Sequence, residues 1–204
     1  MPNFDAWRSA IIGPLEYICR PKEKPDELLA CFPFNGDLLD VSKYGCMYAA
    51  ESSSFTDGGP LGKYATLKGS FVHTTTTTFS IDFFANFGNG GSYGMVMPSS
   101  TLGSGGGLYG TNNDTLLQMT NSNLYMNCGN STWKHYALTY NGTTLKAFAN
   151  GALKITATAT LNLQSMITMV NATKISNLRV VGKVIGDGTT YPVPSTFYTG
   201  FEPL

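Results

Sequence analysis

Acidic and histidine side chains are the groups of this chain that could do acid–base chemistry, and they are few. The 204 residues include 13 Asp and Glu and two His. Glycoside hydrolysis uses two carboxylates placed across the bond that breaks. The acids here are scattered instead, at positions such as Asp57, Asp114 and Asp187, with Asp82 alone in an apolar stretch. We therefore expect a protein that is not an enzyme.

Three further residues invite a chemical interpretation. His135 could act as a general acid or base, but we expect a strand histidine whose hydrogen bonds are satisfied within a sheet. His73 shows no triad-like pairing with Ser and Asp. Trp133 could stack on a sugar, but we expect it to be a core residue.

Neither metals nor phosphates are indicated by the remaining motifs. The spacing of Cys19, Cys31, Cys46 and Cys128 fits no zinc or redox pattern, so we expect free thiols, with a Cys31–Cys46 bridge as the alternative. The glycine-rich stretches 88–91 and 103–107 lack a following Lys-Ser/Thr and precede no helical pattern, which argues against a phosphate-binding loop.

The charge balance excludes other classes of partner. Lys and Arg number 13, the formal net charge is zero, and charged residues make up 13% of the chain. No basic excess is available to neutralise nucleic-acid phosphates. The apolar runs are far shorter than the ~18 residues of a membrane span. The beginning of the chain lacks the basic and apolar regions of a secretory signal.

The elements that must position any site are predicted to be β-strands. Two Asn-Gly turns, at Asn141 and Asn150, separate alternating segments and predict a three-stranded meander over 133–156. Within 77–87, alternation predicts one buried face. That face comprises Phe79, Ile81, Phe83 and Ala85. Further strands are expected at 29–34, 63–68, 93–97, 116–119 and 175–184.

Residues 1–27 differ from the rest. Apolar side chains recur there at helical spacing, although Gly13-Pro14 would break or kink a helix. The set is Phe4, Trp7, Ile11, Leu15 and Ile18. The segment 20–27 concentrates charges around two prolines and is typical of an exposed linker. We expect an arm that either docks on a partner or packs back on its own domain.

The meander resembles a known signature. Residues 133–142 (WKHYALTYNG), followed by 145–151 (LKAFANG), resemble the pattern of laminin-G-like and pentraxin-like domains in the concanavalin A-like lectin/glucanase superfamily. Segments 32–42, 79–84 and 175–180 resemble other strands of that family, in the expected order. The resemblance covers about 28–185. It implies an all-β fold, a two-sheet antiparallel jelly-roll sandwich over 28–204, with 1–27 as a short N-terminal extension.

The chain's end resembles a narrower group. Residues 188–197 (GTTYPVPSTF) resemble the proline-rich and aromatic tails of such domains in bacteriophage structural proteins. The resemblance implies a virion protein made in the host bacterial cytoplasm. We expect residues 1–27 to anchor it to other virion proteins, and we expect a homo-oligomer without nucleic-acid binding or membrane insertion.

Family members mostly bind glycans or proteins, and an uncharged, Asn- and Tyr-rich surface suits neutral sugars. Our candidate glycan-binding residues fall in or beside the glycine-rich stretches. They are Tyr93, Tyr109, Asn112, Asn113 and Asp114. We expect no cofactor and no metal. Some relatives bind calcium through loop oxygens, and the only clusters that offer them here are 112–114 and Asp57-Gly58.

A purely structural role is the competing prediction. The sandwich would then serve in capsid decoration, as a head fibre or in tail assembly, without binding glycans. The two predictions separate on whether the sandwich exposes an aromatic-lined surface.

Overall fold

The computed structural model describes residues 25, 27–73, 76–88, 94–96, 107–111, 114–119, 122–158, 160–161, 166–201 and 204. The apolar positions of the N-terminal arm, Phe4, Trp7, Ile11, Leu15 and Ile18, lie outside this set. In the described part, regular structure consists of antiparallel strands. None of it forms a helix that is long and apolar enough to cross a bilayer.

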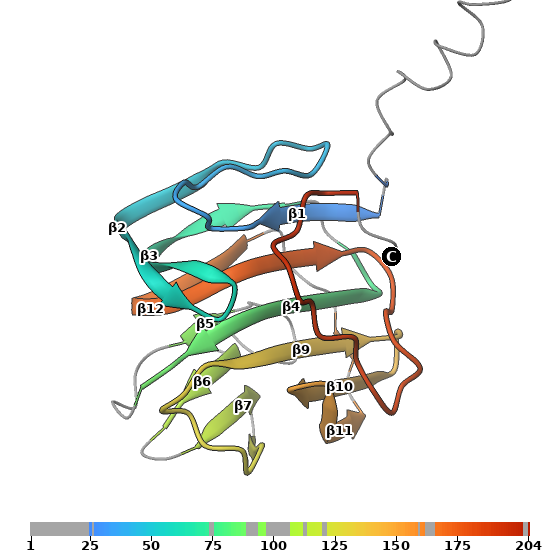
Figure 1. Ribbon diagram of the computed structural model, residues 1–204. Coiled ribbons are helices and arrows are strands. Elements are labelled where there is room, and N and C mark those ends of the chain that lie inside the picture. Colours follow the sequence, from blue (N-terminus) through green and yellow to red (C-terminus); the bar gives the residue numbers. More distant parts are fainter. Residues whose placement is uncertain are drawn as a thin grey trace, which may run out of the picture.

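Twelve strands follow one another along the described chain (Figure 1). Their bounds are β1 Leu28–Phe32, β2 Tyr48–Gly59, β3 Gly62–Val72, β4 Phe79–Asn86, β5 Gly94–Val96, β6 Gly107–Gly110, β7 Thr115–Met119, β8 Ser122–Tyr125, β9 Lys134–Tyr140, β10 Thr144–Ala149, β11 Ala152–Thr158 and β12 Met166–Val181.

The last strand, β12, belongs to both layers of the fold. On one edge it pairs first with β5, through 168–170, and then with β4, through 174–181. On its other edge it pairs first with β3, through 166–175, and then with β1, through 178–181. One layer therefore runs β11-β10-β9-β4-β12, with β1 beside the end of β12, and the other runs β8-β7-β6-β5-β12. β3, with β2 at its edge, follows β12 from one layer into the other. Register shifts near Met169 and Ser176 let β12 bend from one layer into the other. The predicted two-sheet antiparallel sandwich is confirmed.

The main core lies between the two layers. Phe79, Ile81, Phe83 and Ala85 of β4 all point into it, as the alternation predicted. The opposite layer contributes Met95, Leu108 and Leu117 to the same cluster. Residues that alternate with these positions therefore face outward from the sandwich.

The meander β9-β10-β11 turns where the sequence predicted. Asn150 and Gly151 have φ angles of 48° and 78°, the pair of positive values that a type I′ turn requires. Asn150 also holds the neighbouring strand, because its Oδ1 accepts the backbone N–H of His135 and its own N–H donates to the His135 carbonyl. This hairpin fixes where β9 begins.

The chain after β12 crosses the outer face of the β4-β9-β10 layer (Figure 1). Ile185, Tyr191 and Tyr198 of this C-terminal segment pack on outward-facing residues of the strands and form a second, smaller apolar cluster. The strand residues in that cluster are Leu28, Cys31, Ala137, Phe148 and Val181. Both faces of this layer are therefore buried along β4.

The loop between β1 and β2 is organised by one carboxylate. Asp40 accepts the backbone N–H groups of Cys31, Ser42 and Cys46 at 2.6–2.8 Å. Cys31, Cys46 and Cys128 take part in no disulfide. The alternative of a Cys31–Cys46 bridge is therefore wrong, and Cys46 instead donates from Sγ to the Leu29 carbonyl oxygen.

Candidate functional site

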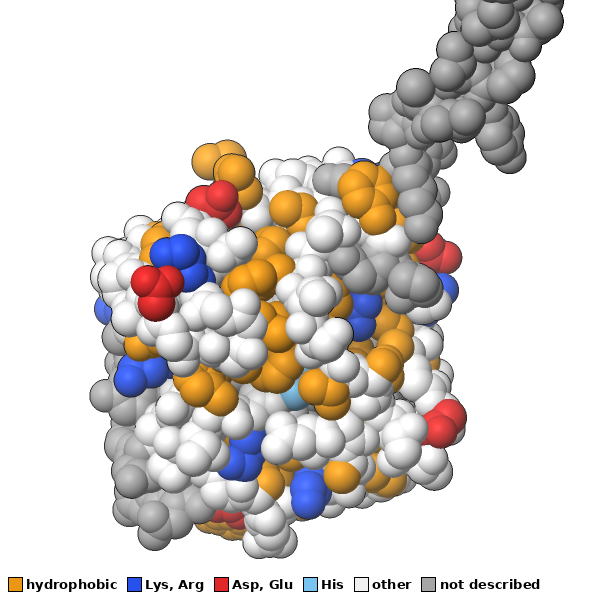
Figure 2. All heavy atoms as spheres, viewed as in Figure 1, with side chains coloured by type: hydrophobic (Ala, Val, Ile, Leu, Met, Phe, Trp, Pro, Cys, Tyr) orange, Lys and Arg blue, Asp and Glu red, His pale blue; other side chains and the backbone are white. Residues whose placement is uncertain are grey.

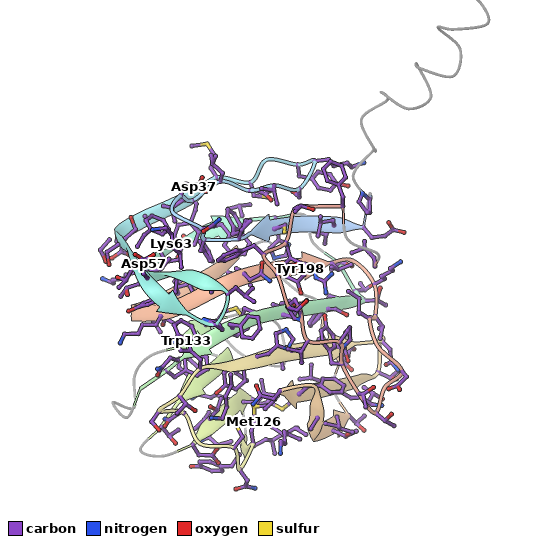
Figure 3. All side chains as sticks on the ribbon, in the orientation of Figure 1. Asp37, Asp57, Lys63, Met126, Trp133 and Tyr198 are labelled. Atoms are coloured by element: carbon purple, nitrogen blue, oxygen red, sulfur yellow. The ribbon has the colours of Figure 1, made fainter. Side chains whose placement is uncertain are left out.

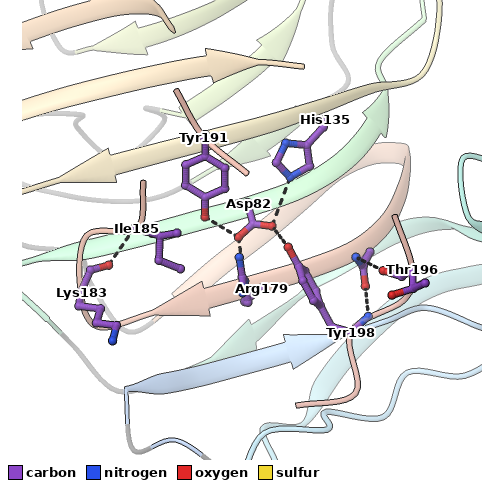
Figure 4. Close-up of polar contacts among 10 residues, drawn as sticks. Asp82, His135, Arg179, Lys183, Ile185, Tyr191, Thr196 and Tyr198 are labelled. Atoms are coloured by element: carbon purple, nitrogen blue, oxygen red, sulfur yellow. Dashed lines mark hydrogen bonds and ion pairs between the residues drawn. The ribbon is translucent and has the colours of Figure 1, made fainter. Parts of the chain in front are cut away.

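The most concentrated group of ionisable side chains surrounds Asp82 on the outer face of β4 (Figure 4). Arg179 of β12 donates from Nε to Oδ2 at 2.9 Å, and the Tyr191 hydroxyl donates to the same oxygen at 2.7 Å. His135 Nε2 of β9 lies 3.3 Å from Oδ1, which also accepts the hydroxyl proton of Tyr198. Asp82 is therefore not alone, contrary to our expectation.

The electrostatics of this cluster favour one ionisation state. Burial opposes the charged form of Asp82, but the guanidinium of Arg179 and the hydrogen bonds from His135 and Tyr198 hold its pKa below the usual range. Burial and the Asp82 charge raise the pKa of Tyr198 and of Tyr191. The cluster thus contains a carboxylate, a guanidinium and two neutral phenols.

The cluster anchors the C-terminal segment. Asp82 and His135 have no exposed surface, and Arg179 lies with its guanidinium carbon 4.3 Å from the ring centre of Tyr198. A substrate cannot reach a carboxylate that is covered on all sides. The predicted structural role of His135 holds only in part. Its Nε2 faces Asp82 and its ring packs on Phe84, but its buried Nδ1 has no hydrogen-bond partner among the described residues.

Beside the cluster, the C-terminal segment borders an open pocket of about 280 Å³. Its walls come from 192–196, with Ile185, Arg179 and Tyr198 completing them. Half of this lining is proline and aliphatic, and the polar groups of Arg179 and Tyr198 are already bonded to Asp82. The pocket offers little polar chemistry of its own.

A pair of aromatic side chains lies further along the same outer face. Trp133, just before β9, meets Tyr64 of β3 edge-to-face with ring centres 5.0 Å apart. Both are half-buried, and neither belongs to the apolar clusters. The expectation that Trp133 is a core residue is therefore wrong: it stands at the surface because it precedes the first inward residue of β9.

The strand register places Phe84, Asn86 and Lys174 on the same outer face as this aromatic pair, and we call the five residues together the Trp133 face. The register aligns Lys174 with Asn86, and both alternate with core residues, so they point outward. Phe84 is 8% exposed. Figure 3 shows Trp133, Lys63 and Asp57 along one side of the molecule. In Figure 2, apolar side chains gather towards the middle of this view and charged ones mostly nearer its margins.

Of the predicted glycan-binding residues, Tyr93, Asn112 and Asn113 lie outside the described residues. Tyr109 and Asp114 are described, and both belong to the layer opposite the Trp133 face. Tyr109 is half-buried on β6, and its ring leans over Gly94 of the adjacent β5.

Asp114 closes a loop. Oδ1 accepts the backbone N–H groups of Thr115, Cys128 and Gly129, and Oδ2 accepts that of Asn127. Burial acts against ionisation, but these four donors lower the pKa of Asp114. A carboxylate already surrounded by N–H groups is poorly placed to bind a cation.

The other loop considered for calcium offers a single acid. Asp57 pairs with Lys63 at 3.1 Å, on an exposed surface. Among the described residues, no three His, Cys, Asp or Glu side chains gather closely enough to hold a metal ion.

Sequence reasoning missed Tyr64 as a site residue. Nothing in the sequence signals that β3 and the segment before β9 come together, because β4 and β12 lie between them in the sheet. The one feature of the sequence that could have indicated this site is Trp133 itself, a large aromatic residue immediately before a strand.

The comparisons with known proteins identify the fold. No protein-family model matches the sequence, and no curated protein sequence matches it either. Among solved structures, the chain is similar to domain 4 of a GH43 extracellular arabinanase from Geobacillus stearothermophilus in complex with arabinotriose. The TM-score is 0.56 at 14% identity, over 81% of this chain and 94% of that domain.

The chain is also similar to binding domains of botulinum neurotoxins. That of serotype D/C gives a TM-score of 0.57 at 15% identity, over 79% of this chain and 50% of the neurotoxin domain. A type DC binding domain in complex with SialylT gives 0.55 at 17% identity. The chain spans about half the length of these domains. At such low identities, the likeness establishes the all-β fold.

Proposed function

We propose that this chain is a non-catalytic carbohydrate-binding module that binds neutral glycans on the Trp133 face. The observation that carries the proposal is the half-buried pair of Trp133 and Tyr64, with ring centres 5.0 Å apart, on the outer face of the sheet. Aromatic rings stack on the C–H faces of sugars, and neighbouring amides and amines bind sugar hydroxyls.

The groups around the pair suit such a ligand. Asn86 and Lys174 supply hydrogen-bond donors, and Oδ1 of Asn86, which already accepts the backbone N–H of Gly88, has a second lone pair that can accept from a hydroxyl. Three strands, β3, β4 and β12, and the loop before β9 hold these side chains, so little conformational entropy is lost on binding. Asp82 lies fully buried beneath the C-terminal segment. The residues of the Trp133 face therefore include no carboxylate that could act in hydrolysis.

The structural comparisons support the same class of ligand. The similar arabinanase domain was solved with arabinotriose, and a similar neurotoxin binding domain with SialylT. Entry of botulinum neurotoxin type C, also similar in fold, depends on two ganglioside molecules. Our proposal extends glycan binding to this chain on the strength of its own aromatic pair.

We further propose that the module is displayed on a bacteriophage particle and attached through residues 1–27. Support comes from the resemblance of residues 188–197 to the tails of phage structural domains and from the net charge of zero. A test is to purify intact particles and probe them with an antibody against this chain. Absence of the chain from washed particles would contradict the virion role and leave the glycan proposal standing.

A structural role without glycan binding is the second candidate. It is favoured by two exposed apolar side chains in the loop between β1 and β2, Leu39 at 66% and Met47 at 86% exposure. Such residues suit contact with a neighbouring subunit.

Glycan arrays with the full chain decide between the two candidates. We expect binding by the wild type and at least a tenfold loss in Trp133→Ala, equivalent to about 1.4 kcal/mol. Tyr64→Ala should weaken binding less. Tyr44→Ala is the matched control, because Tyr44 is exposed and lies on a different loop. A wild type that binds no glycan would overturn the proposal and favour the structural role.

A further inference from the structure

A second row of aromatic and apolar side chains lies on the opposite layer. The strand register places Gly94 beside Tyr109, Tyr109 beside Leu116, and Leu116 beside Tyr125. Directly opposed residues of antiparallel strands share one face of the sheet. Their sequence neighbours Leu108 and Leu117 point into the core, so this row faces outward.

The row forms a shallow platform. Tyr125 is 53% exposed and Leu116 8%, with Tyr109 half-buried. A Cβ on Gly94 would lie 2.6 Å from Cδ1 of Tyr109, so the absence of a side chain at Gly94 lets the tyrosine ring settle against the sheet. Tyr109 and Tyr125 are two strand spacings apart, about 10 Å.

A row of amides runs beside the aromatic one. Gln118 of β7 pairs with Asn123 of β8, and both side chains are exposed. They lie two residues along the strands from Leu116 and Tyr125, a separation of about 7 Å. Each amide offers both donors and acceptors. The platform thus combines rings that stack with groups that bind hydroxyls.

The four strands of this surface carry no charge. β5, β6, β7 and β8 consist of GMV, GLYG, TLLQM and SNLY, without Asp, Glu, Lys, Arg or His. Phosphates, nucleic acids and anionic lipids would find no cation here. The apolar part is also narrow, because Leu116 is nearly covered, whereas a stable protein interface buries about 800 Å² per partner.

We propose that the outer face of β6, β7 and β8 is a second carbohydrate-binding surface, for a neutral oligosaccharide that runs across the strands. Tyr109 and Tyr125 stack on separate sugar rings, and Gln118 and Asn123 bind hydroxyls along one edge. This inference rests on the proposed function of the Trp133 face and deepens it. With one surface on each layer, a single chain bridges two glycan strands.

Titration calorimetry with the full chain tests this proposal. The probes are linear arabinan, β-1,4-glucan and β-1,3-glucan oligosaccharides of six sugars. For a probe that binds, we expect two sites per chain in the wild type, and one in the double variant Tyr125→Ala/Gln118→Ala. Trp133→Ala should also retain one site, and the combined variant none. Thermal melting checks each fold, and Tyr44→Ala is the control for loss of an exposed tyrosine.

The outcomes separate the two proposals. One wild-type site that survives Tyr125→Ala/Gln118→Ala but is lost in Trp133→Ala overturns the second surface and leaves the proposed function intact. One site lost only in the double variant overturns the proposed function instead. Binding to none of the probes overturns both for neutral linear glycans. A dimer in analytical ultracentrifugation that Tyr125→Ala dissociates would make this face a contact between copies and overturn the inference.

Discussion

The hydroxyl of Tyr191 donates a 2.7 Å hydrogen bond to Oδ2 of Asp82, a residue 109 positions earlier in the chain. Tyr198 donates to the other oxygen from a further turn of the same C-terminal segment. The segment after β12 is thus fastened to the middle of β4 at two points. It is a covering layer of the sandwich, and the outer surface left open to ligands is the part that it does not reach.

Asp82→Asn should destabilise the protein by about 3–5 kcal/mol, because it leaves the buried Arg179 without a countercharge. Denaturation in urea, followed by fluorescence, measures the change. Limited proteolysis should at the same time cleave the segment 186–190 faster. Asp57→Asn is the control, since its exposed pair with Lys63 is worth at most about 1 kcal/mol. Equal effects of the two substitutions would contradict the anchoring role.

The free energy of unfolding should fall in acid. The pKa of Asp82 is lowered in the folded state, so the unfolded chain binds more protons and stability rises with pH. The contribution is complete above an unfolded pKa of about 4 and is lost as the pH falls through the lower native value. Asp114 acts in the same direction.

Denaturation midpoints between pH 2 and pH 7 measure this dependence. The wild type should be flat above about pH 5 and decline below pH 4. Asp82→Asn should have a shallower decline. An unchanged slope in the variant would show that other carboxylates carry the effect.

Two substitutions at Asn177 can distinguish the cost of its backbone conformation from the contribution of its side-chain hydrogen bond. It has a φ of 58° in β12, and its Oδ1 accepts the backbone N–H of Tyr198 at 2.7 Å. Asn177→Gly removes the side-chain hydrogen bond, but glycine adopts this φ without strain. Asn177→Ala removes the same hydrogen bond and, in addition, places a Cβ in a left-handed backbone conformation, which is unfavourable. We expect both to destabilise, with Ala worse than Gly by about 1 kcal/mol. Thermal melting compares them, and equal melting temperatures would exclude strain.

Cys46 should react slowly with alkylating reagents. Burial, the nearby Asp40 charge and a hydrogen bond to Asp40 raise the pKa of its thiol to about 12, so little thiolate exists at neutral pH. Iodoacetamide labelling at pH 8, read by mass spectrometry, should modify Cys46 in urea but hardly in the native protein. Rapid labelling of native Cys46 would contradict this environment.

The sequence predicted most of what depends on local pattern. Alternation in β4 identified its core residues, and Asn150-Gly151 formed the expected turn. β2 went unpredicted because its Ser52-Ser53-Ser54 run is exposed on both faces, so no alternation marks it. The first half of β12 was missed because a register shift between Met169 and Thr173 interrupts its pattern.

The sites depend on contacts that sequence separation conceals. Asp82 looked isolated because its partners lie 53 to 116 residues away. Trp133 was assigned to the core because large aromatics in strands are usually buried, but the strand starts one residue later. Tyr109 was predicted as a site residue because it follows a glycine-rich stretch of the sequence. Tyr125 lies two strands away on the same face, and only the strand register brings the two tyrosines together.

The shared strand β12 also sets the order in which the molecule can be completed. It is the last strand of the described chain, yet both layers close through it. During synthesis, the β9-β10-β11 meander can form as soon as it is made. The two layers can pack against each other around the core only after residues 166–181 have been added. A ribosome-bound chain that stops before this strand therefore exposes both inner faces, and the folded population consists of chains that have passed it.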